Sequence, residues 1–179
     1  MTLGEGAAYL VLEAEEEVQG KKVYGEVRGY GNTNDAFHAS SISEEATGIV
    51  SAIQGALDSA ELTPQDIHYI NGHGTGTPNN DAAELHGLQQ VFENIPPYHS
   101  TKTYTGHTLA AAGSVEAIFT LLALNYGELY PSLNFKTPIE GYEATPPITT
   151  YKATQSLQHA LSNSFGFGGN CSALIFSKV

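Results

Sequence analysis

Three glycines surround a single histidine in the stretch NGHGTGTP, and this pattern is compatible with two kinds of chemistry. His73 lies between Gly72 and Gly74, and Gly76 follows shortly after. Backbone N–H groups exposed by the glycines could hold a phosphate at the start of a helix. Alternatively, the absence of side chains could let a substrate approach the imidazole closely enough for chemistry.

The spacing of these glycines does not fit the phosphate-binding loops. The pattern is G-x-G-x-G rather than G-x-G-x-x-G, and no Lys-Ser or Lys-Thr pair follows it. No acidic residue ends a second strand about twenty residues further on, as a dinucleotide site requires. The sequence therefore favours the interpretation in which His73 takes part in the chemistry.

A second stretch, STKTYTGH, carries a lysine and another histidine. We expect His107 in the first turn of a long helix, where the positive end of the helix dipole disfavours the imidazolium form. Lys102 lies close by and acts in the same direction, so His107 should be a neutral hydrogen-bond donor. Glu116 is a carboxylate in an otherwise apolar part of that helix, and Lys102 is its expected partner.

A third stretch, SNSFGFGGN, is a glycine loop that contains aromatic residues. Phe167 lies between Gly166 and the pair Gly168 and Gly169. The flexible backbone on both sides lets the Phe167 ring swing and leaves the Phe167 backbone N–H able to face a ligand. On burial tendencies alone, Phe165 and Phe167 would both be expected in the core.

The remaining candidates for chemistry are expected to be structural. His68, His86, His99 and His159 are predicted to be surface residues or satisfied core residues. Cys171, the only cysteine, opens an apolar strand and is predicted to be a small buried residue rather than a nucleophile. No H-E-x-x-H or Cys-x-x-Cys spacing occurs, so no metal site is predicted.

Composition limits the classes of partner. The formal charge of −12 comes from seven Lys and Arg against 19 Asp and Glu, and the bases are scattered, so nucleic-acid binding is not predicted. One cysteine cannot form an internal disulfide, which favours a reducing compartment. The apolar segment Thr108–Leu124 contains Glu116 and many small residues, so we expect a buried helix, no membrane association and a cytoplasmic location.

The elements that position these residues alternate between strand and helix, which predicts an α/β fold with a mixed sheet. Compact apolar runs indicate strands, and apolar residues every three to four positions indicate helices. Ser43 is the expected N-cap of the first helix. The predicted elements are strands at Ala7–Glu13 (buried), Lys22–Gly31 and Ile67–Asn71, helices at Ser43–Ala60, Pro78–Phe92 and Thr108–Asn125, an irregular connection at Tyr130–Pro147, and two strands around the last glycine loop.

Taken together, NGHGTGTPNNDAAE, STKTYTGHTLAAAGSVEA and SNSFGFGGNCSALIF resemble, in order and approximate spacing, three motifs of the β-ketoacyl-acyl carrier protein synthases. These are the condensing enzymes of fatty acid and polyketide synthesis. The resemblance covers essentially the whole chain, LGEGAAYLVLE included. It implies a thiolase-like fold, of which residues 21–179 would be the C-terminal synthase domain, a mixed β-sheet flanked by helices. Residues 1–20 would be the last strand and exit segment of the N-terminal half.

The resemblance also implies roles for individual residues. His73 and His107 match the two catalytic histidines, which would donate hydrogen bonds to a malonyl thioester carbonyl as carbon dioxide leaves. Lys102 and Glu116 would set the electrostatics and geometry of His107. Phe167 matches a gating phenylalanine whose N–H would complete an oxyanion hole.

Supporting residues follow from the same motifs. Asp81 matches the acid that closes the first motif and would hold its loop. Gly168 and Gly169 match the glycines that follow the gating phenylalanine.

The resemblance further implies what this chain lacks. The family carries the acyl group on a cysteine of the first half, and Cys171 falls in the wrong motif to be that residue. We therefore expect the chain to be inactive alone and to need an N-terminal half that bears the cysteine. Substrates would arrive on the phosphopantetheine of an acyl carrier protein, with no other cofactor, and the complete protein would be a homodimer or heterodimer. The alternative is a non-catalytic partner subunit similar to a chain-length factor; the retained histidines, Lys102 and Phe167 argue against it.

Overall fold

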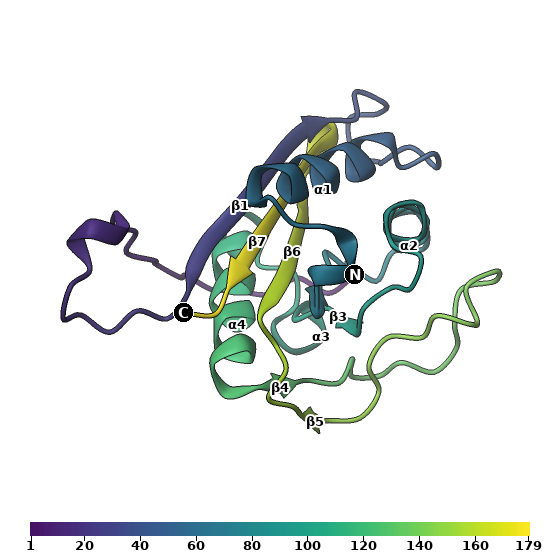
Figure 1. The fold of residues 1–179 in the computed structure, drawn as a ribbon. Coiled ribbons are helices and arrows are strands. Elements are labelled where there is room, and N and C mark those ends of the chain that lie inside the picture. Colours follow the sequence, from purple (N-terminus) through teal and green to yellow (C-terminus); the bar gives the residue numbers. More distant parts are fainter.

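A mixed five-stranded sheet forms the centre of the computed structural model, which describes residues 1–179 (Figure 1). β1, β7 and β6 pair antiparallel, whereas β6, β2 and β3 pair parallel. In spatial order the strands are β1 (Glu26–Asn34), β7 (Asn170–Ser177), β6 (His159–Phe165), β2 (Tyr69–Asn71) and β3 (Tyr98–His99). The predicted α/β fold with a mixed sheet is confirmed.

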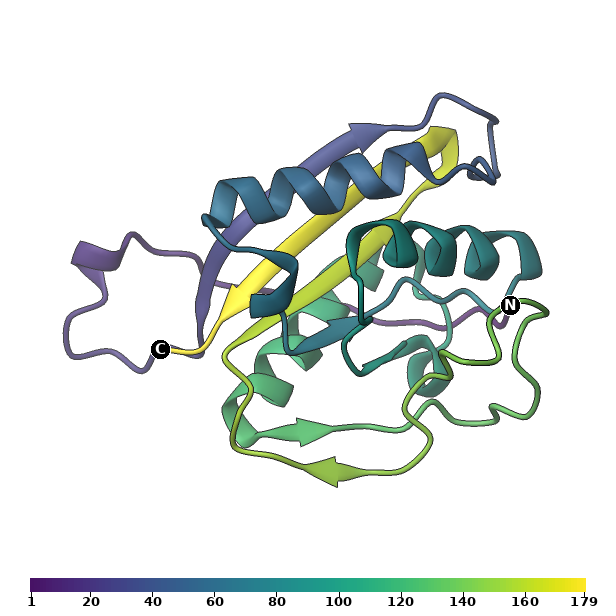
Figure 2. The same cartoon turned by 45° about the vertical axis from the view of Figure 1, so that its right-hand side comes forward.

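Helices cover both faces of this sheet. Figure 2 shows α1 (Thr47–Ala60) and α2 (Pro78–Val91) side by side on one face, and α4 (Ala112–Tyr126) on the other. Alternate residues of a strand point to opposite faces. In β2, Ile70 accordingly joins the core beneath α1 and α2, while Tyr69 joins the core beneath α4. The sheet therefore has a separate hydrophobic core on each side.

α1 lies very close to β1 because small residues face each other. A Cβ atom added at Gly31 would come within 1.9 Å of the Ala52 carbonyl oxygen, and one added at Gly29 within 2.3 Å of the Ala56 carbonyl oxygen. Both alanines are fully buried. The glycines of the YGEVRGYG stretch therefore allow the helix to pack directly on the strand backbone.

α4 is the most apolar helix of the chain. With the 3-10 turn before it (Leu109–Ala111), the stretch Leu109–Tyr126 is long and apolar enough, by length and composition alone, to cross a membrane. In the structure the helix packs on β6 instead, and Ala117, Ala123 and Leu124 are buried. A helix that packs in the core beside a sheet can have the same length and apolar composition.

The start of the chain corrects one prediction. Residues 1–20 contain no strand, only a 3-10 turn at Glu15–Glu17 and a single bridge from Leu3 to His107. Tyr9 and Val11 are 90% and 88% exposed, so the predicted buried strand at Ala7–Glu13 is wrong in this chain. The run is apolar, but no strand of the sheet lies beside it, and part of the segment loops away from the body (Figure 1).

Two further predictions need correction at element boundaries. β1 begins at Glu26, later than expected, and continues to Asn34. Ser43 is not the N-cap of α1, because its hydroxyl and its backbone N–H both donate to the Asp35 carboxylate, at 2.8 and 2.7 Å. Ala46, in the left-handed conformation with φ 56°, occupies the cap position instead.

The remaining elements are short. Beyond β3, the chain forms one helical turn before His107 that the sequence did not predict. The segment 130–147 is irregular, as predicted, and it connects two short paired strands that the sequence did not predict. The short elements are 3-10 turns at Pro64–Asp66 and Phe167–Gly169, α3 (Lys102–Thr105), β4 (Glu128–Leu129) and β5 (Lys152–Ala153).

Candidate active site

His73 follows β2 directly, in the glycine loop that leads to α2. Its side chain is 4% exposed, and Phe165 of β6 packs near it with ring centroids 5.2 Å apart. The Lys102 ammonium lies 3.2 Å from His73 Nδ1. An ammonium can only donate, so Nδ1 must accept, and the ring proton resides on Nε2. His73 is thereby a neutral imidazole with one N–H to offer.

His107 lies in the connection between α3 and α4, not in the first turn of the long helix. Gly106 turns the chain with φ 68°, and the 3-10 turn from Leu109 separates His107 from α4. The dipole of α4 therefore acts on His107 from further away than predicted. The Leu109 backbone N–H donates to His107 Nδ1 at 3.1 Å, which again leaves the ring proton on Nε2.

The structure brings the two histidines together. Their ring centroids lie 5.5 Å apart, with planes at 88°. Burial, followed by the charge of Lys102, lowers the pKa of both histidines below its ordinary value, and His107 adds to the effect on His73. Both rings are therefore held neutral.

Lys102 and Glu116 form the expected buried ion pair, with the lysine 4% and the glutamate 2% exposed at their side chains. Ser164 donates a further hydrogen bond to Glu116 at 3.4 Å. Burial raises the pKa of Glu116 to about 7, although the Lys102 charge opposes this by favouring the carboxylate. The sequence assigned this pair to His107, but the direct hydrogen bond of Lys102 to an imidazole goes to His73.

Glu84 is a site residue that sequence reasoning missed. This buried carboxylate on α2 accepts the backbone N–H groups of His73 and Gly74, at 2.8 and 2.9 Å, and the Asn163 side-chain amide at 3.2 Å. It is the main anchor of the histidine loop. Glu84 lies three residues after Asp81, on the same face of a predicted helix, and this spacing could have indicated that both carboxylates face the loop.

Asp81 also contacts the loop, at the end away from His73. Its Oδ1 accepts the Gly76 N–H at 3.2 Å. Burial, followed by the charge of Glu84, raises the pKa of Asp81 to about 6. The two carboxylates therefore share the work of fixing the loop backbone.

Two glycines of the first motif, Gly72 and Gly74, are closely approached by neighbouring side chains. Gly74 has φ 40°, and a Cβ atom there would come within 2.5 Å of the Ser100 side chain. A Cβ atom at Gly72 would approach Glu84 Oε1 to 3.2 Å. The absence of side chains thus lets Glu84 reach the loop backbone and lets the loop pack on the segment after β3.

The two phenylalanines of the third motif differ in environment. Phe165 is buried, as its type predicts, whereas Phe167 is 77% exposed, so the core prediction is wrong for Phe167. Gly168 and Gly169 have φ of 80° and 82°, in the region that favours glycine. A Cβ atom at Gly169 would lie 2.9 Å from the Ala36 nitrogen. The turn therefore holds the Phe167 ring out in solvent.

The other candidates are structural. Cys171 is fully buried, and burial raises the pKa of its thiol to about 12, which makes it a poor nucleophile. His99 is buried and its Nδ1 lies 2.8 Å from the Tyr69 hydroxyl, while His159 Nδ1 lies 2.8 Å from the Ser177 hydroxyl.

A cavity of about 330 Å³ opens in front of the site. Lys102, His107, Thr75 and Thr103 are among the residues that line it, and Gly74 and Gly76 form part of its wall. His73 is not part of this lining. A ligand in this cavity would contact His107, whose ring centroid is 5.5 Å from that of His73.

Comparisons with known proteins give the class of fold. The chain superposes on the ishigamide ketosynthase/chain length factor with a TM-score of 0.92 and 31% identity, covering 99% of this chain and 44% of that one. It superposes on AntDE:AntF, described as a type II PKS acyl-carrier protein in complex with its ketosynthase, with a TM-score of 0.87 and 28% identity, covering 93% of this chain and 42% of that one. The fold is thiolase-like, as the resemblance implied.

The sequence comparisons give the family. Residues 24–136 match the family described as Beta-ketoacyl synthase, C-terminal domain. The 3-oxoacyl-[acyl-carrier-protein] synthase 2 of Vibrio cholerae is 39% identical, over 99% of this chain and 44% of its own length. The mitochondrial 3-oxoacyl-[acyl-carrier-protein] synthase of Arabidopsis thaliana is 40% identical, over 99% of this chain and 40% of its own. The chain belongs to the β-ketoacyl synthase C-terminal domain family, and it spans less than half the length of these relatives.

Proposed function

We propose that this chain is the histidine-bearing part of a 3-oxoacyl-acyl carrier protein synthase, an acyltransferase of fatty acid or polyketide synthesis. The observation that carries the proposal is the state of the two imidazoles. The Nδ1 atoms of His73 and His107 both accept hydrogen bonds, so both rings present Nε2–H, and the rings lie 5.5 Å apart. Two neutral donors placed together suit an oxygen that gains negative charge.

The reaction would be a decarboxylative Claisen condensation. The carbonyl oxygen of a malonyl thioester would accept the Nε2–H groups of both rings. Loss of carbon dioxide leaves an enolate whose charge rests on that oxygen. The carbanion carbon then attacks an acyl thioester on a cysteine, so that a carbon–carbon bond forms, the carbon–sulfur bond breaks and the thiolate is released.

The thiol must come from polypeptide other than residues 1–179. Cys171 cannot supply it, because its thiol is fully buried and its pKa is raised to about 12. We therefore assign the nucleophile to an N-terminal synthase half and propose that the isolated chain is inactive. The exposed Phe167 would gate access to that thiol, and its N–H would complete the oxyanion hole together with the N–H of the cysteine.

The surrounding residues would hold the two donors in place. Lys102 fixes the tautomer of His73, and Glu116 keeps the lysine in position. Asp81 holds the loop that carries His73, while Gly168 and Gly169 provide the turn at the Phe167 gate.

The proposal includes partners and location. Substrates would be delivered on the phosphopantetheine of an acyl carrier protein, with no other cofactor, and the structural relative that is described in complex with an acyl-carrier protein supports this. The complete protein would act in the cytoplasm as a homodimer or heterodimer, without binding nucleic acid or membrane.

A second candidate function is a non-catalytic partner subunit similar to a chain-length factor. Two structural relatives are described as ketosynthases together with a chain length factor. Both histidines, Lys102 and an exposed Phe167 are present in the arrangement described above, and a scaffold has no need of them. A cysteine-bearing synthase half encoded in frame with this chain would favour the catalytic candidate.

The proposal is tested by combining the chain with an N-terminal half that bears the cysteine and measuring malonyl-dependent condensation. His73→Ala and His107→Ala should each lower the rate by about 10²- to 10³-fold, as expected for loss of one oxyanion donor. His86→Ala, on α2, is the matched control and should retain the rate. Equal rates in all three variants would show that the histidines have been assigned wrongly.

A further inference from the structure

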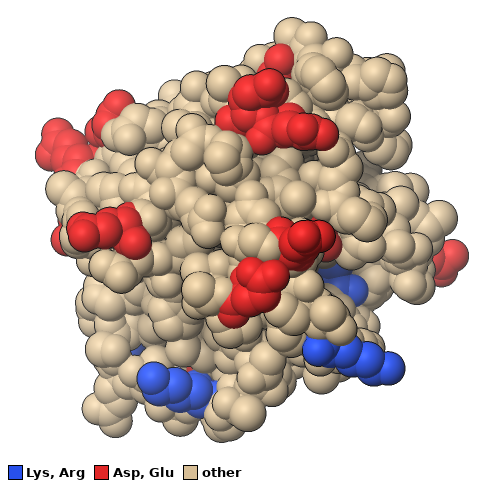
Figure 3. Space-filling view, turned by 90° about the vertical axis from the view of Figure 1, so that its right-hand side faces the viewer, with Lys and Arg blue, Asp and Glu red and all other residues tan.

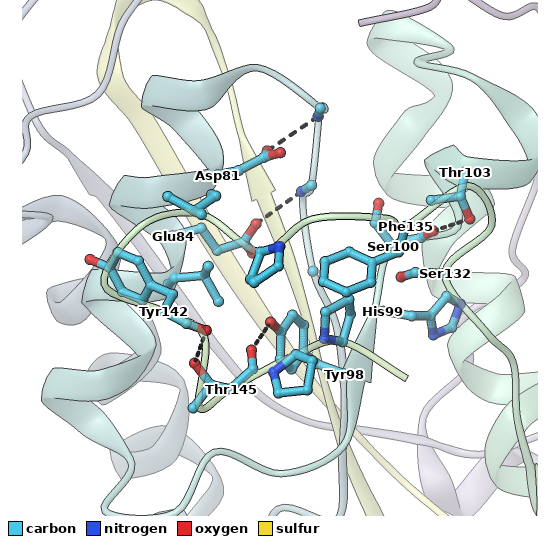
Figure 4. A pocket seen from close by; sticks show the side chains of 18 of the residues that line it. Asp81, Glu84, Tyr98, His99, Ser100, Thr103, Ser132, Phe135, Tyr142 and Thr145 are labelled. Carbon is cyan, nitrogen blue, oxygen red and sulfur yellow. Dashed lines mark hydrogen bonds between the residues drawn. The ribbon is translucent and has the colours of Figure 1, made fainter. Parts of the chain in front are cut away.

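A second cavity borders the histidine loop, and His107 is not among the residues that line it. Its volume is about 270 Å³, and its walls are α2, the segment after β3 and the irregular segment 130–147 (Figure 4). It shares Gly74, Gly76, Thr103 and Asn134 with the cavity that His107 lines. The glycine loop therefore borders both cavities.

One face of α2 forms the wall of this second cavity. Asp81, Glu84, Leu85 and Leu88 follow the i, i+3, i+4, i+7 spacing of a single helix face, and all four line the cavity. Figure 4 shows the two carboxylates beside the loop, with their hydrogen bonds to its backbone. The polar half of this face thus meets the loop and the apolar half extends away from it.

The opposite wall carries several apolar side chains, together with polar ones such as Asn134 and Thr137, and is fixed to the sheet. Phe135, Pro138, Ile139 and Tyr142 line it from the irregular segment. That segment is anchored to β3, because the Tyr98 hydroxyl donates to the Thr145 carbonyl at 2.6 Å. The Ile148 N–H donates to the Tyr98 carbonyl at 2.8 Å. The cavity is therefore bounded by elements held in place by hydrogen bonds.

The charge of this cavity is unbalanced. Its lining includes two carboxylates, from Asp81 and Glu84, and no lysine or arginine. The nearby Lys102 is already engaged by Glu116 and His73. The face shown in Figure 3, which is the right-hand side of Figure 1, carries dispersed acidic side chains, with the basic ones toward its lower part. A cation inside the cavity would relieve this imbalance.

We propose that this cavity binds a small organic amine, with its ammonium group at Asp81 and an aromatic or aliphatic body against Phe135 and Tyr142. The volume suits a ligand of modest size, and pockets of mainly apolar lining with a few convergent polar groups are the usual form of small-molecule sites. The burial that raises the pKa of Asp81 to about 6 also strengthens its attraction for a cation.

Binding at this site would affect His73 through Glu84. Glu84 lines the cavity and also accepts the His73 backbone N–H, so an ammonium near the two carboxylates perturbs the anchor of the catalytic loop. The amine would lie in a different cavity from the one that His107 lines. The site is therefore a candidate for regulation by a molecule unlike the thioester substrates.

The test uses isothermal titration calorimetry of the chain with 2-phenylethylamine, and with 2-phenylethanol as the matched neutral probe. We expect saturable binding of one amine per chain and at least tenfold weaker binding of the alcohol. Asp81→Asn should weaken amine binding about tenfold or more, whereas Asp58→Asn, an exposed change of the same charge on α1, should leave it unchanged.

The location is checked independently with Phe135→Ala, which removes the aromatic wall without touching the loop and should weaken binding of the amine. Absence of saturable amine binding, or equal binding of amine and alcohol, would overturn the proposal. Unchanged amine binding in both Asp81→Asn and Phe135→Ala would overturn it as well. None of these measurements depends on turnover, so the outcome is separate from that of the condensation assay.

Discussion

His73 and His107 meet edge to face, with ring centroids 5.5 Å apart and planes at 88°, although they follow different strands of the sheet. Each ring has its Nδ1 occupied by a different donor, the Lys102 ammonium for His73 and the Leu109 N–H for His107. The Nε2–H of each ring therefore remains free for a ligand.

Phe165 and Phe167 should differ sharply when each is replaced by alanine. Phe165 is buried against His73, so Phe165→Ala should lower the free energy of unfolding by about 3–5 kcal/mol. Phe167 is 77% exposed, so Phe167→Ala should change it by no more than about 0.5 kcal/mol. Urea denaturation measures both. A large loss of stability in Phe167→Ala would mean that its ring packs inside the protein.

Glu84→Gln should destabilise the histidine loop. The carboxylate accepts two backbone N–H groups through different oxygens, and an amide side chain offers only one oxygen. One buried N–H is left without an acceptor, which costs about 1–3 kcal/mol of unfolding free energy. Glu93→Gln, at an exposed position just after α2, is the control and should show no loss. Equal stability of both variants would refute the anchoring role of Glu84.

The Lys102–Glu116 pair should show strong coupling. Lys102→Met leaves the Glu116 carboxylate buried without its counter-ion, which we expect to cost about 3–5 kcal/mol of unfolding free energy at pH 8. The double variant Lys102→Met/Glu116→Gln removes the uncompensated charge and should be more stable than Lys102→Met alone. Additive losses in the double variant would mean that the two groups do not interact.

The stability of Asp81→Asn relative to the unsubstituted chain should increase as the pH rises. The pKa of Asp81 is about 6 in the folded chain against an ordinary value of 3.8, so the unfolded chain ionises first and ionisation disfavours folding. This loss of unfolding free energy is small below pH 3.8, grows between pH 4 and 6 and is nearly complete above pH 6. Asparagine does not ionise. The unfolding free energy of Asp81→Asn relative to the unsubstituted chain should thus rise by up to about 3 kcal/mol between pH 4 and 7.

Denaturation curves at each pH measure this difference, with Asp58→Asn on α1 as the matched loss of one exposed carboxylate. If this difference for Asp81→Asn stays constant with pH, burial does not raise the pKa of the Asp81 carboxyl in the unsubstituted chain.

The sequence predicted most of the sheet and α1, whose apolar residues recur strongly on one face. It also predicted α2, although the apolar spacing of that helix is weak. It also singled out His73, His107, Lys102 and Glu116, which the structure brings together. Periodicity cannot identify what an apolar run packs against. The run at 7–13 was therefore predicted to be a buried strand, although no strand of this chain lies beside it.

The errors within the site arise from contacts between distant parts of the chain. Ser43 has the residue type of an N-cap, but Asp35 competes for its hydroxyl and its N–H. Glu84 was missed because its ligands are backbone N–H groups of a preceding loop, which no side-chain pattern reveals. His107 was placed in the helix because the turn at Gly106 and the 3-10 segment after it leave no signal in the apolar spacing.

The protonation state of the two histidines tests the account most directly. Long-range ¹H–¹⁵N correlation NMR on the chain distinguishes the two neutral tautomers and the imidazolium of each ring. We predict that at pH 7 the rings of His73 and His107 are both neutral with the proton on Nε2, and that the neutral form of each still predominates at pH 6.5, the ordinary histidine pKa. A proton on Nδ1 of either ring, or an imidazolium at pH 7, would contradict the account.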